Sequence, residues 1–245
     1  MKRNVLCTLA FDGSAFHGWQ RQPNAFTAQQ AVEAAVLRVT GENTPVVGCS
    51  RTDAGVHARM FCCHFRTQSA VPCAKLPAAL NFYLPDALSV QCCEDVPDAF
   101  HARYDCKEKT YRYHLRNSRT RDPFLLRRAW FEGAPMDAAL LHAQAQDFLG
   151  THDFSSFCAA GADTKTAVRT VRRFEVTRES DDVFFTVAAD GFLYNMVRIM
   201  VGTLTDIAKG KRPPGCIPGV LAAKNRAAAG LTAPAAGLFL WAINY

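Results

Sequence analysis

One short segment of the chain combines several residue types that can do chemistry. Between two apolar runs, residues 48–58 read GCSRTDAGVHA and contain Arg51, Asp53 and His57. A carboxylate with an ordinary pKa is ionised at neutral pH, so Asp53 can act as a nucleophile or electrostatic partner but is a poor general acid. Asp53 with Gly55 also satisfies a simple turn. Both interpretations stay open, and we assign His57 no role because no Ser or Cys partner can be tied to it.

A second segment, KTYRYHLR at residues 109–116, has the alternation of a strand. Side chains of a strand point alternately to its two faces. One face, the aromatic face, therefore carries Tyr111, Tyr113 and Leu115. The other, the basic face, carries Arg112, His114 and Arg116. Aromatic rings stack on exposed bases, for roughly 1–3 kcal/mol per base, and arginines bind phosphates. The strand either binds nucleic acid or is an ordinary core strand with Tyr111 on its buried face.

A third segment, DGFLYNMVRIMVGTL at residues 190–204, has a broad apolar stripe at helical spacing. Arg198 lies on a different face of this predicted helix. Because an unpaired buried charge is very costly, Arg198 requires a carboxylate or a backbone partner. Asp53 is one candidate, and a purely structural ion pair is the alternative. A fourth segment, FDGSAFHGWQRQ at residues 11–22, is predicted to be a loop whose aromatic and polar tips face a ligand.

The elements that must position these residues follow a repeated order. Alternation of apolar residues predicts a strand over 2–11. A capping box formed by Thr27 and Gln30 predicts the start of a helix, and Gly41 predicts its end. The rest of the first half is predicted to form a strand, a second strand, a helix and a third strand, in this order. The second half repeats this order, with strands at 109–115, 168–177, 183–189 and 238–245 and helices at 138–149 and 194–209. We therefore expect an α+β fold of two tandem ferredoxin-like βαββαβ units, 1–105 and 106–245, with mainly antiparallel sheets and helices packed on one face.

Composition narrows the class of protein. The chain has 245 residues, of which 49% are hydrophobic, so it can bury a large core. No apolar run is long enough to span a bilayer and no signal peptide is evident, so we expect a cytoplasmic protein without membrane contact. The ten cysteines lack Cys-x-x-Cys spacing and are interpreted as reduced core residues.

The charge of the chain permits a polyanionic partner, because it has 28 Lys and Arg against 22 Asp and Glu. The arginines clustered near 112–128 and 169–178 fit either a solvated basic face or a phosphate-binding surface.

Taken in order, these segments closely resemble the tRNA pseudouridine synthase A family over essentially the whole chain. The resemblance rests on FDGSAFHGWQRQP, TAQQAVEAAV, GCSRTDAGVHA, KTYRYHL, FSSF at 154–157 and DGFLYNMVRIMVGTL. The Arg-Thr-Asp core is the most diagnostic motif. Ser50 stands where many members have glycine, and Cys158 where arginine is frequent.

The resemblance implies isomerisation of uridine to pseudouridine at positions 38, 39 and 40 of the tRNA anticodon arm, without cofactor or metal. It implies a catalytic cleft between the two units and a homodimer that holds the tRNA. Asp53 would be the nucleophile, on base or sugar, with Arg198 beside it. Tyr111 would contact the target base, and Arg51 would fill the space left by the flipped uridine.

Two other functions compete with this interpretation. A ferredoxin-like sheet with surface aromatics and arginines also binds single-stranded RNA without chemistry, but a pure binder gains nothing from an anion aimed at phosphates. An Asp-nucleophile hydrolase would require a second carboxylate or a metal cluster near the first, and the sequence has no paired-carboxylate motif.

Overall fold

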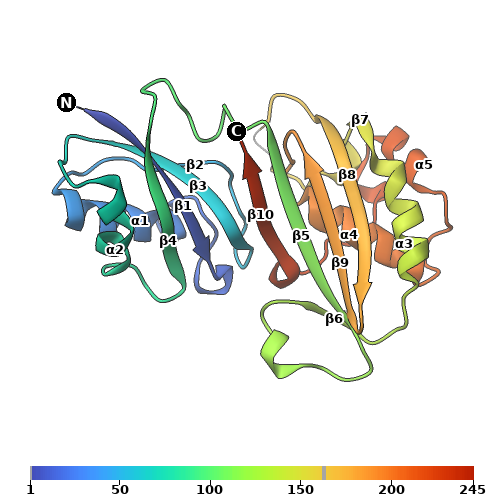
Figure 1. The fold of residues 1–245 in the computed structure, drawn as a ribbon. Helices are drawn as coiled ribbons and strands as arrows, with labels where there is room; N and C mark the ends of the chain where they lie inside the picture. Colours follow the sequence, from blue (N-terminus) through green and yellow to red (C-terminus); the bar gives the residue numbers. More distant parts are fainter. Residues whose placement is uncertain (1, 162–163) are drawn as a thin grey trace. The chain divides into compact units, whose positions relative to one another are not determined.

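The computed structural model describes residues 2–161 and 164–245 and has an α+β fold with mostly antiparallel strand pairs (Figure 1). The chain divides into two compact units, each of which is considered separately. The first unit contains Met1–Lys107 and Leu240–Tyr245, and the second contains Glu108–Phe239.

The first unit is a sheet with two helices. Its strands lie in the order β4-β1-β3-β10, and the short β2 also pairs with β3. The elements are β1 (Arg3–Phe11), α1 (Ala28–Thr40), β2 (Val47–Gly48), β3 (His57–Thr67), α2 (Leu76–Asn81), β4 (Leu88–Val96) and the greater part of β10 (Leu238–Asn244). In β1 the side chains Val5, Cys7, Leu9 and Phe11, which share one face, are all buried, but Asn4 and Leu6 on the other face are buried too, so the expected alternation holds only towards the end of the strand.

Helix α1 shows how local sequence fixes an element. The Thr27 side chain accepts from the Gln30 backbone N–H, and the Gln30 side chain accepts from Thr27, so the predicted capping box is present. Gly41 ends the helix with a φ of 74°, a conformation that glycine adopts without steric cost.

The second unit has the strand order β5-β9-β8-β7, with β6 parallel to β5. Helices α3 and α4 pack against each other, and α3 also packs on β8. The elements are β5 (Glu108–Asn117), β6 (Trp130–Glu132), α3 (Ala138–Ala145), β7 (Gly150–Asp153), β8 (Val168–Glu179), β9 (Asp182–Ala189), α4 (Met196–Ala208) and α5 (Ile217–Ala223).

The end of the chain differs from the expectation that residues 106–245 form one unit. Leu240–Tyr245 group with the first unit. Lys107 N donates to Asn244 O at 2.9 Å, and the Tyr245 hydroxyl donates to Ala102 O, also at 2.9 Å.

The cysteines and the helices test two further expectations from composition. All ten cysteines are free, but only Cys7, Cys49, Cys62 and Cys63 are buried, so the core interpretation is wrong for Cys92, which is exposed. Cys92 lies on β4, an edge strand in the order of its unit, and the neighbouring residues Gln91, Glu94 and Asp95 of this strand are exposed as well. Within residues 2–161 and 164–245, no helix combines the length and apolarity needed to cross a membrane.

Candidate active site

The Asp53 loop connects β2 to β3 and is a genuine turn. Val56 N donates to Asp53 O at 3.1 Å, and Gly55 has a φ of 78°, so the turn interpretation is confirmed. Arg51 is exposed, Thr52 is buried, and Asp53 is half-buried between them. The Arg51 guanidinium is therefore accessible to solvent and the Asp53 carboxylate is partly accessible, whereas Thr52 between them is held inside the protein.

The loop after β1 holds the Asp53 loop in place. Trp19 N donates to Thr52 O at 3.1 Å. A Cβ on Gly18 would lie 2.4 Å from Thr52 O, and a Cβ on Gly13 would lie 2.0 Å from Val56 O. Since both neighbours are backbone atoms, only glycine permits this approach.

This loop was predicted to offer its aromatic tips to a ligand, and the structure corrects that prediction in part. Phe16 and Trp19 are 4% and 2% exposed, and they pack with Phe11 and Phe61. These rings therefore do not face a ligand. Their packing in the core holds the backbone of this loop next to the Asp53 loop.

His57, to which sequence reasoning gave no role, helps to join the two loops. It is 2% exposed, and its Nδ1 lies 3.1 Å from both Gly13 N and Asp12 Oδ1. Nδ1 accepts from the Gly13 N–H when it carries no proton, and donates to Asp12 when it does. The only sequence signal for this role is the FDG triplet at 11–13, whose acid and glycine both meet the imidazole.

Strand β5 places Tyr111 on its buried face. Burial alternates along the strand, with Tyr111 6% exposed and Tyr113 fully buried, as the period of a strand predicts. The Tyr111 ring meets Phe192 edge-to-face with centroids 5.0 Å apart. The Tyr113 hydroxyl donates to Pro234 O at 2.8 Å, and burial raises the pKa of Tyr113.

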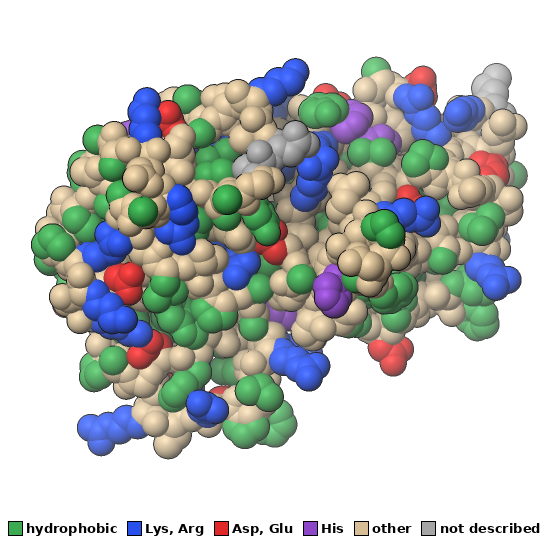
Figure 2. Space-filling model, turned by 180° about the vertical axis from the view of Figure 1, so that it is seen from behind, with side chains coloured by type: hydrophobic (Ala, Val, Ile, Leu, Met, Phe, Trp, Pro, Cys, Tyr) green, Lys and Arg blue, Asp and Glu red, His purple; other side chains and the backbone are tan. Residues whose placement is uncertain are grey.

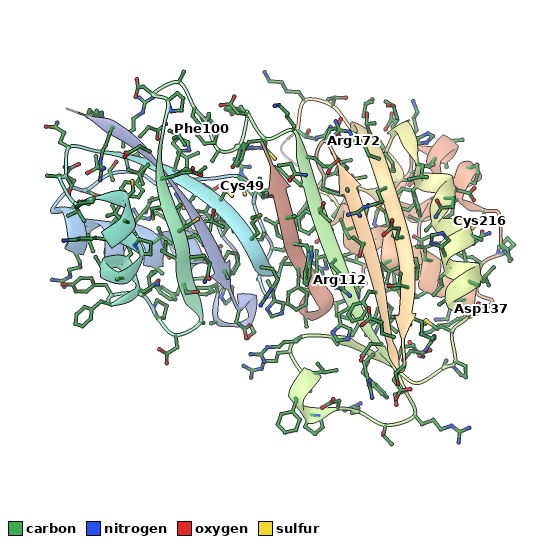
Figure 3. All side chains as sticks on the ribbon, viewed as in Figure 1. Cys49, Phe100, Arg112, Asp137, Arg172 and Cys216 are labelled. Carbon is green, nitrogen blue, oxygen red and sulfur yellow. The ribbon has the colours of Figure 1, made fainter. Side chains whose placement is uncertain are left out.

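The opposite face of β5 is basic but already paired with acids. Arg116 bonds Asp181 and Asp182 at 3.0 and 3.1 Å, and His114 lies 2.8 Å from Asp182. Arg112, labelled in Figure 3, lies 3.8 Å from the centre of the Phe184 ring. The basic charges of this face are therefore largely paired with acidic side chains of their own unit.

Arg198 finds the backbone partner that its burial requires. Its Nε donates to Ala233 O and its Nη1 donates to Asn195 Oδ1, both at 2.7 Å. Asn195 precedes α4 with a φ of 60°. The predicted apolar stripe of this helix is buried along its whole length: Leu193, Met196, Val197, Met200, Val201 and Leu204.

The four predicted site residues come from three different segments of the chain, which belong to two units. Arg51 and Asp53 share one loop of the first unit, whereas Tyr111 and Arg198 lie on β5 and α4 of the second. Within the part of the chain that the structure describes, no group of three or more His, Cys, Asp or Glu is placed to hold a metal ion. Basic side chains are interspersed with acidic ones on the face drawn in Figure 2.

Known proteins match the chain along nearly its whole length. A family model described as tRNA pseudouridine synthase matches residues 8–105 and 144–245. The curated protein "tRNA pseudouridine synthase A" of Brevibacillus brevis is 45% identical over 245 residues, covering 100% of both chains. Its namesake from Moorella thermoacetica is 46% identical over 241 residues, covering 97% of this chain and 98% of that protein.

Similarity to solved structures is much weaker. A chain in the crystal structure of the archaeal box H/ACA sRNP Nop10-Cbf5 complex matches with a TM-score of 0.39 and 12% identity, covering 80% of this chain and 44% of that chain. The matches along the full sequence, which include the Arg51 and Asp53 loop, are the informative ones.

Proposed function

Because the chain belongs to the tRNA pseudouridine synthase family, we propose that it isomerises uridine to pseudouridine at positions 38, 39 and 40 in the anticodon stem-loop of tRNA. Members of this family are isomerases. The reaction breaks the bond from ribose C1′ to base N1 and forms a bond from C1′ to C5. The hydrogen at C5 leaves as a proton, and N1 gains a proton, so the reaction needs no oxidant or reductant.

The observation that carries the proposal is the Arg-Thr-Asp loop, which is intact within a chain that aligns with its relatives from end to end. Asp53 is the proposed nucleophile. Its loop is held by backbone contacts to Gly13, Gly18 and Trp19, so the carboxylate begins from a fixed position. Fixed geometry reduces the entropy lost on reaching the transition state.

The other three residues take supporting roles in the proposal. Arg198 stabilises the ionised form of Asp53, because a nearby cation lowers the pKa of a carboxyl group. Tyr111 contacts the target base, and Arg51 occupies the space that the flipped uridine leaves. These roles require the catalytic cleft to lie between the two units, since the residues come from both.

The fold that we propose for this cleft is a pair of ferredoxin-like units. In the first unit, the order β4-β1-β3-β2 with α1 and α2 between strands supports this assignment. In the second half of the chain, the order β5, α3, β8, β9, α4, β10 has the same pattern, with β6 and β7 as insertions, although most of β10 groups with the first unit. The proposed partner is tRNA, the proposed state is a homodimer in the cytoplasm, and no cofactor is invoked.

The test follows the release of tritium from tRNA that carries tritiated uridine at C5. We expect the wild-type protein to release tritium from tRNA with an unmodified anticodon arm, and Asp53→Asn to release none while it binds the same tRNA. Asp86→Asn, which changes an exposed carboxylate of the same unit, is the matched control and should retain activity. Turnover by Asp53→Asn would refute the role of Asp53. A wild-type protein that binds but releases nothing would favour the RNA-binding module.

A further inference from the structure

The first unit contains a pocket outside the positions assigned above, apart from Arg51 at its edge. Its volume is about 180 Å³. Its lining includes Val46, Val47 and Gly48 of the β2 region, and His101, Arg103 and Tyr104 of the turn at residues 101–104. The lining residues, all of which the structure describes, include two arginines and no Asp or Glu. Such a pocket is electrostatically suited to an anion.

The turn at 101–104 is held rigidly. His101 Nδ1 accepts from Arg103 N at 3.2 Å and Tyr104 N at 3.3 Å, while the His101 N–H donates to the Asp105 carboxylate at 2.8 Å. The His101 ring stacks on Tyr104 with centroids 4.2 Å apart. Phe100, labelled in Figure 3, precedes this turn and packs on Tyr245 at 4.9 Å. Little conformational entropy is therefore lost when a ligand meets the turn.

Tyr104 and Arg103 are exposed on this rigid support. Tyr104 is 75% exposed, whereas aromatic side chains usually bury most of their area against neighbouring residues. Among the described residues, the Arg103 guanidinium has no acidic partner, and it lies 5.9 Å from the centre of the Tyr104 ring. An exposed aromatic ring beside an unpaired guanidinium matches the two parts of a nucleotide, a base with a π face and a phosphate.

Two further lining residues, Trp19 and Gln20, carry side-chain hydrogen-bond donors. The Trp19 indole is 2% exposed, and its Nε1 edge lies against Gly48, where a Cβ would come within 2.5 Å. Among the described residues, this indole N–H and the Gln20 amide have no hydrogen-bond partner, and both residues line the pocket. The Gln29 amide is different, because it is already bonded to Val46 O and to Arg21 N.

We propose that this pocket is a second nucleotide subsite for single-stranded RNA, distinct from the position of the isomerised uridine. A base next to the target stacks on Tyr104, its edge accepts from Trp19 or Gln20, and Arg103 binds its phosphate. The inference rests on the proposed function, since it assigns the nucleotide to the loop of the same tRNA. It accounts for an exposed aromatic residue that contributes little to the core of its own unit.

The test compares the affinity for unmodified tRNA among Tyr104→Leu, Tyr104→Phe and a control, Tyr83→Leu, which alters another exposed tyrosine of the same unit. Loss of one base stack should raise Kd about 5- to 150-fold in Tyr104→Leu. Tyr104→Phe keeps the ring and should bind within about 2-fold of wild type, as should Tyr83→Leu. Equal Kd values for Tyr104→Leu and Tyr83→Leu would overturn the subsite.

A second variant tests the phosphate contact. Arg103→Gln should reduce the slope of log Kd against log salt by about 1, because one fewer counterion is released. An unchanged slope would overturn the assignment of Arg103. The two proposals fail separately: tritium release by wild type with no effect of Tyr104→Leu removes only the subsite. Binding that depends on Tyr104 without tritium release removes only the isomerase activity.

Discussion

His64 gives the first unit a pH-dependent stability whose size follows from its surroundings. The side chain lies on β3, is 7% exposed, and accepts at Nδ1 from Ala102 N at 3.1 Å. Burial is the main cause that lowers the pKa of His64 from 6.5 to about 4, and the positive charges of His101 and Arg66 add to it, while Asp105 opposes it. Protonation would also remove the acceptor that holds the 101–105 turn.

The sign of the effect follows from where the proton binds. Between pH 6.5 and about 4, the unfolded chain protonates His64 while the folded chain does not, so unfolding takes up a proton. The free energy of unfolding is therefore complete above pH 6.5 and falls as the pH decreases towards 4. A pKa difference of about 2.5 units corresponds to about 3 kcal/mol at most, and about 2 kcal/mol of this is lost by pH 5.

The assay is urea unfolding at pH 7 and at pH 5 for wild type and for His64→Asn. Asparagine keeps an oxygen acceptor close to the position of Nδ1 but does not titrate. Other groups titrate over the same range in both proteins, so the difference between the two pH effects isolates His64. We expect wild type to lose about 2 kcal/mol more than the variant. Equal losses, or a His64 resonance that titrates near 6.5 in NMR, would refute the reasoning.

Two further predictions concern the second unit. Tyr111→Leu should reduce tritium release far more than it lowers the urea midpoint, because the ring is proposed to contact the base; proportionate loss of both would instead assign Tyr111 to the core. Gly202→Ala in α4 should cost more than about 2 kcal/mol, because its Cβ would lie 1.9 Å from Leu231 O, a backbone atom. Gly219→Ala in α5 is the matched control, with open space at its Cβ, and should be neutral or stabilising by about 0.5–1 kcal/mol in a thermal or urea melt.

The elements that could be predicted are those whose signals are local. The capping box at Thr27, the stop at Gly41 and the alternation through Tyr111 each depend on residues close in sequence, and the structure confirms all three. The helix expected over 138–149 is α only to Ala145, and a 3₁₀ turn then completes it before β7. Element ends fray in this way, so their exact bounds carry little information.

The features that sequence reasoning missed depend on partners distant in the chain. Strand β6 has only three residues and exists because it lies parallel to Leu115–Asn117 of β5. Leu240–Tyr245 belong to the first unit, where Asn244 and Tyr245 form hydrogen bonds with Lys107 and Ala102, which are distant in the sequence. No periodicity within such short segments encodes the strand that they will join, so tertiary pairing decides.

In the candidate site, too, the chemical residues have a local sequence signal, whereas the residues that hold them in place do not. Asp53 and Arg51 were found from residue type, but their support comes from Gly13 and Gly18, whose sequence signal was only that of a loop. Since a Cβ at either glycine would collide with the backbone of the Asp53 turn, these residues fix the distance between two loops rather than provide flexibility. The segment from Phe11 to Gln22 therefore contributes to chemistry through the geometry that it imposes on Asp53, and its exposed end at Gln20 leads directly into the pocket that we assign to a second nucleotide.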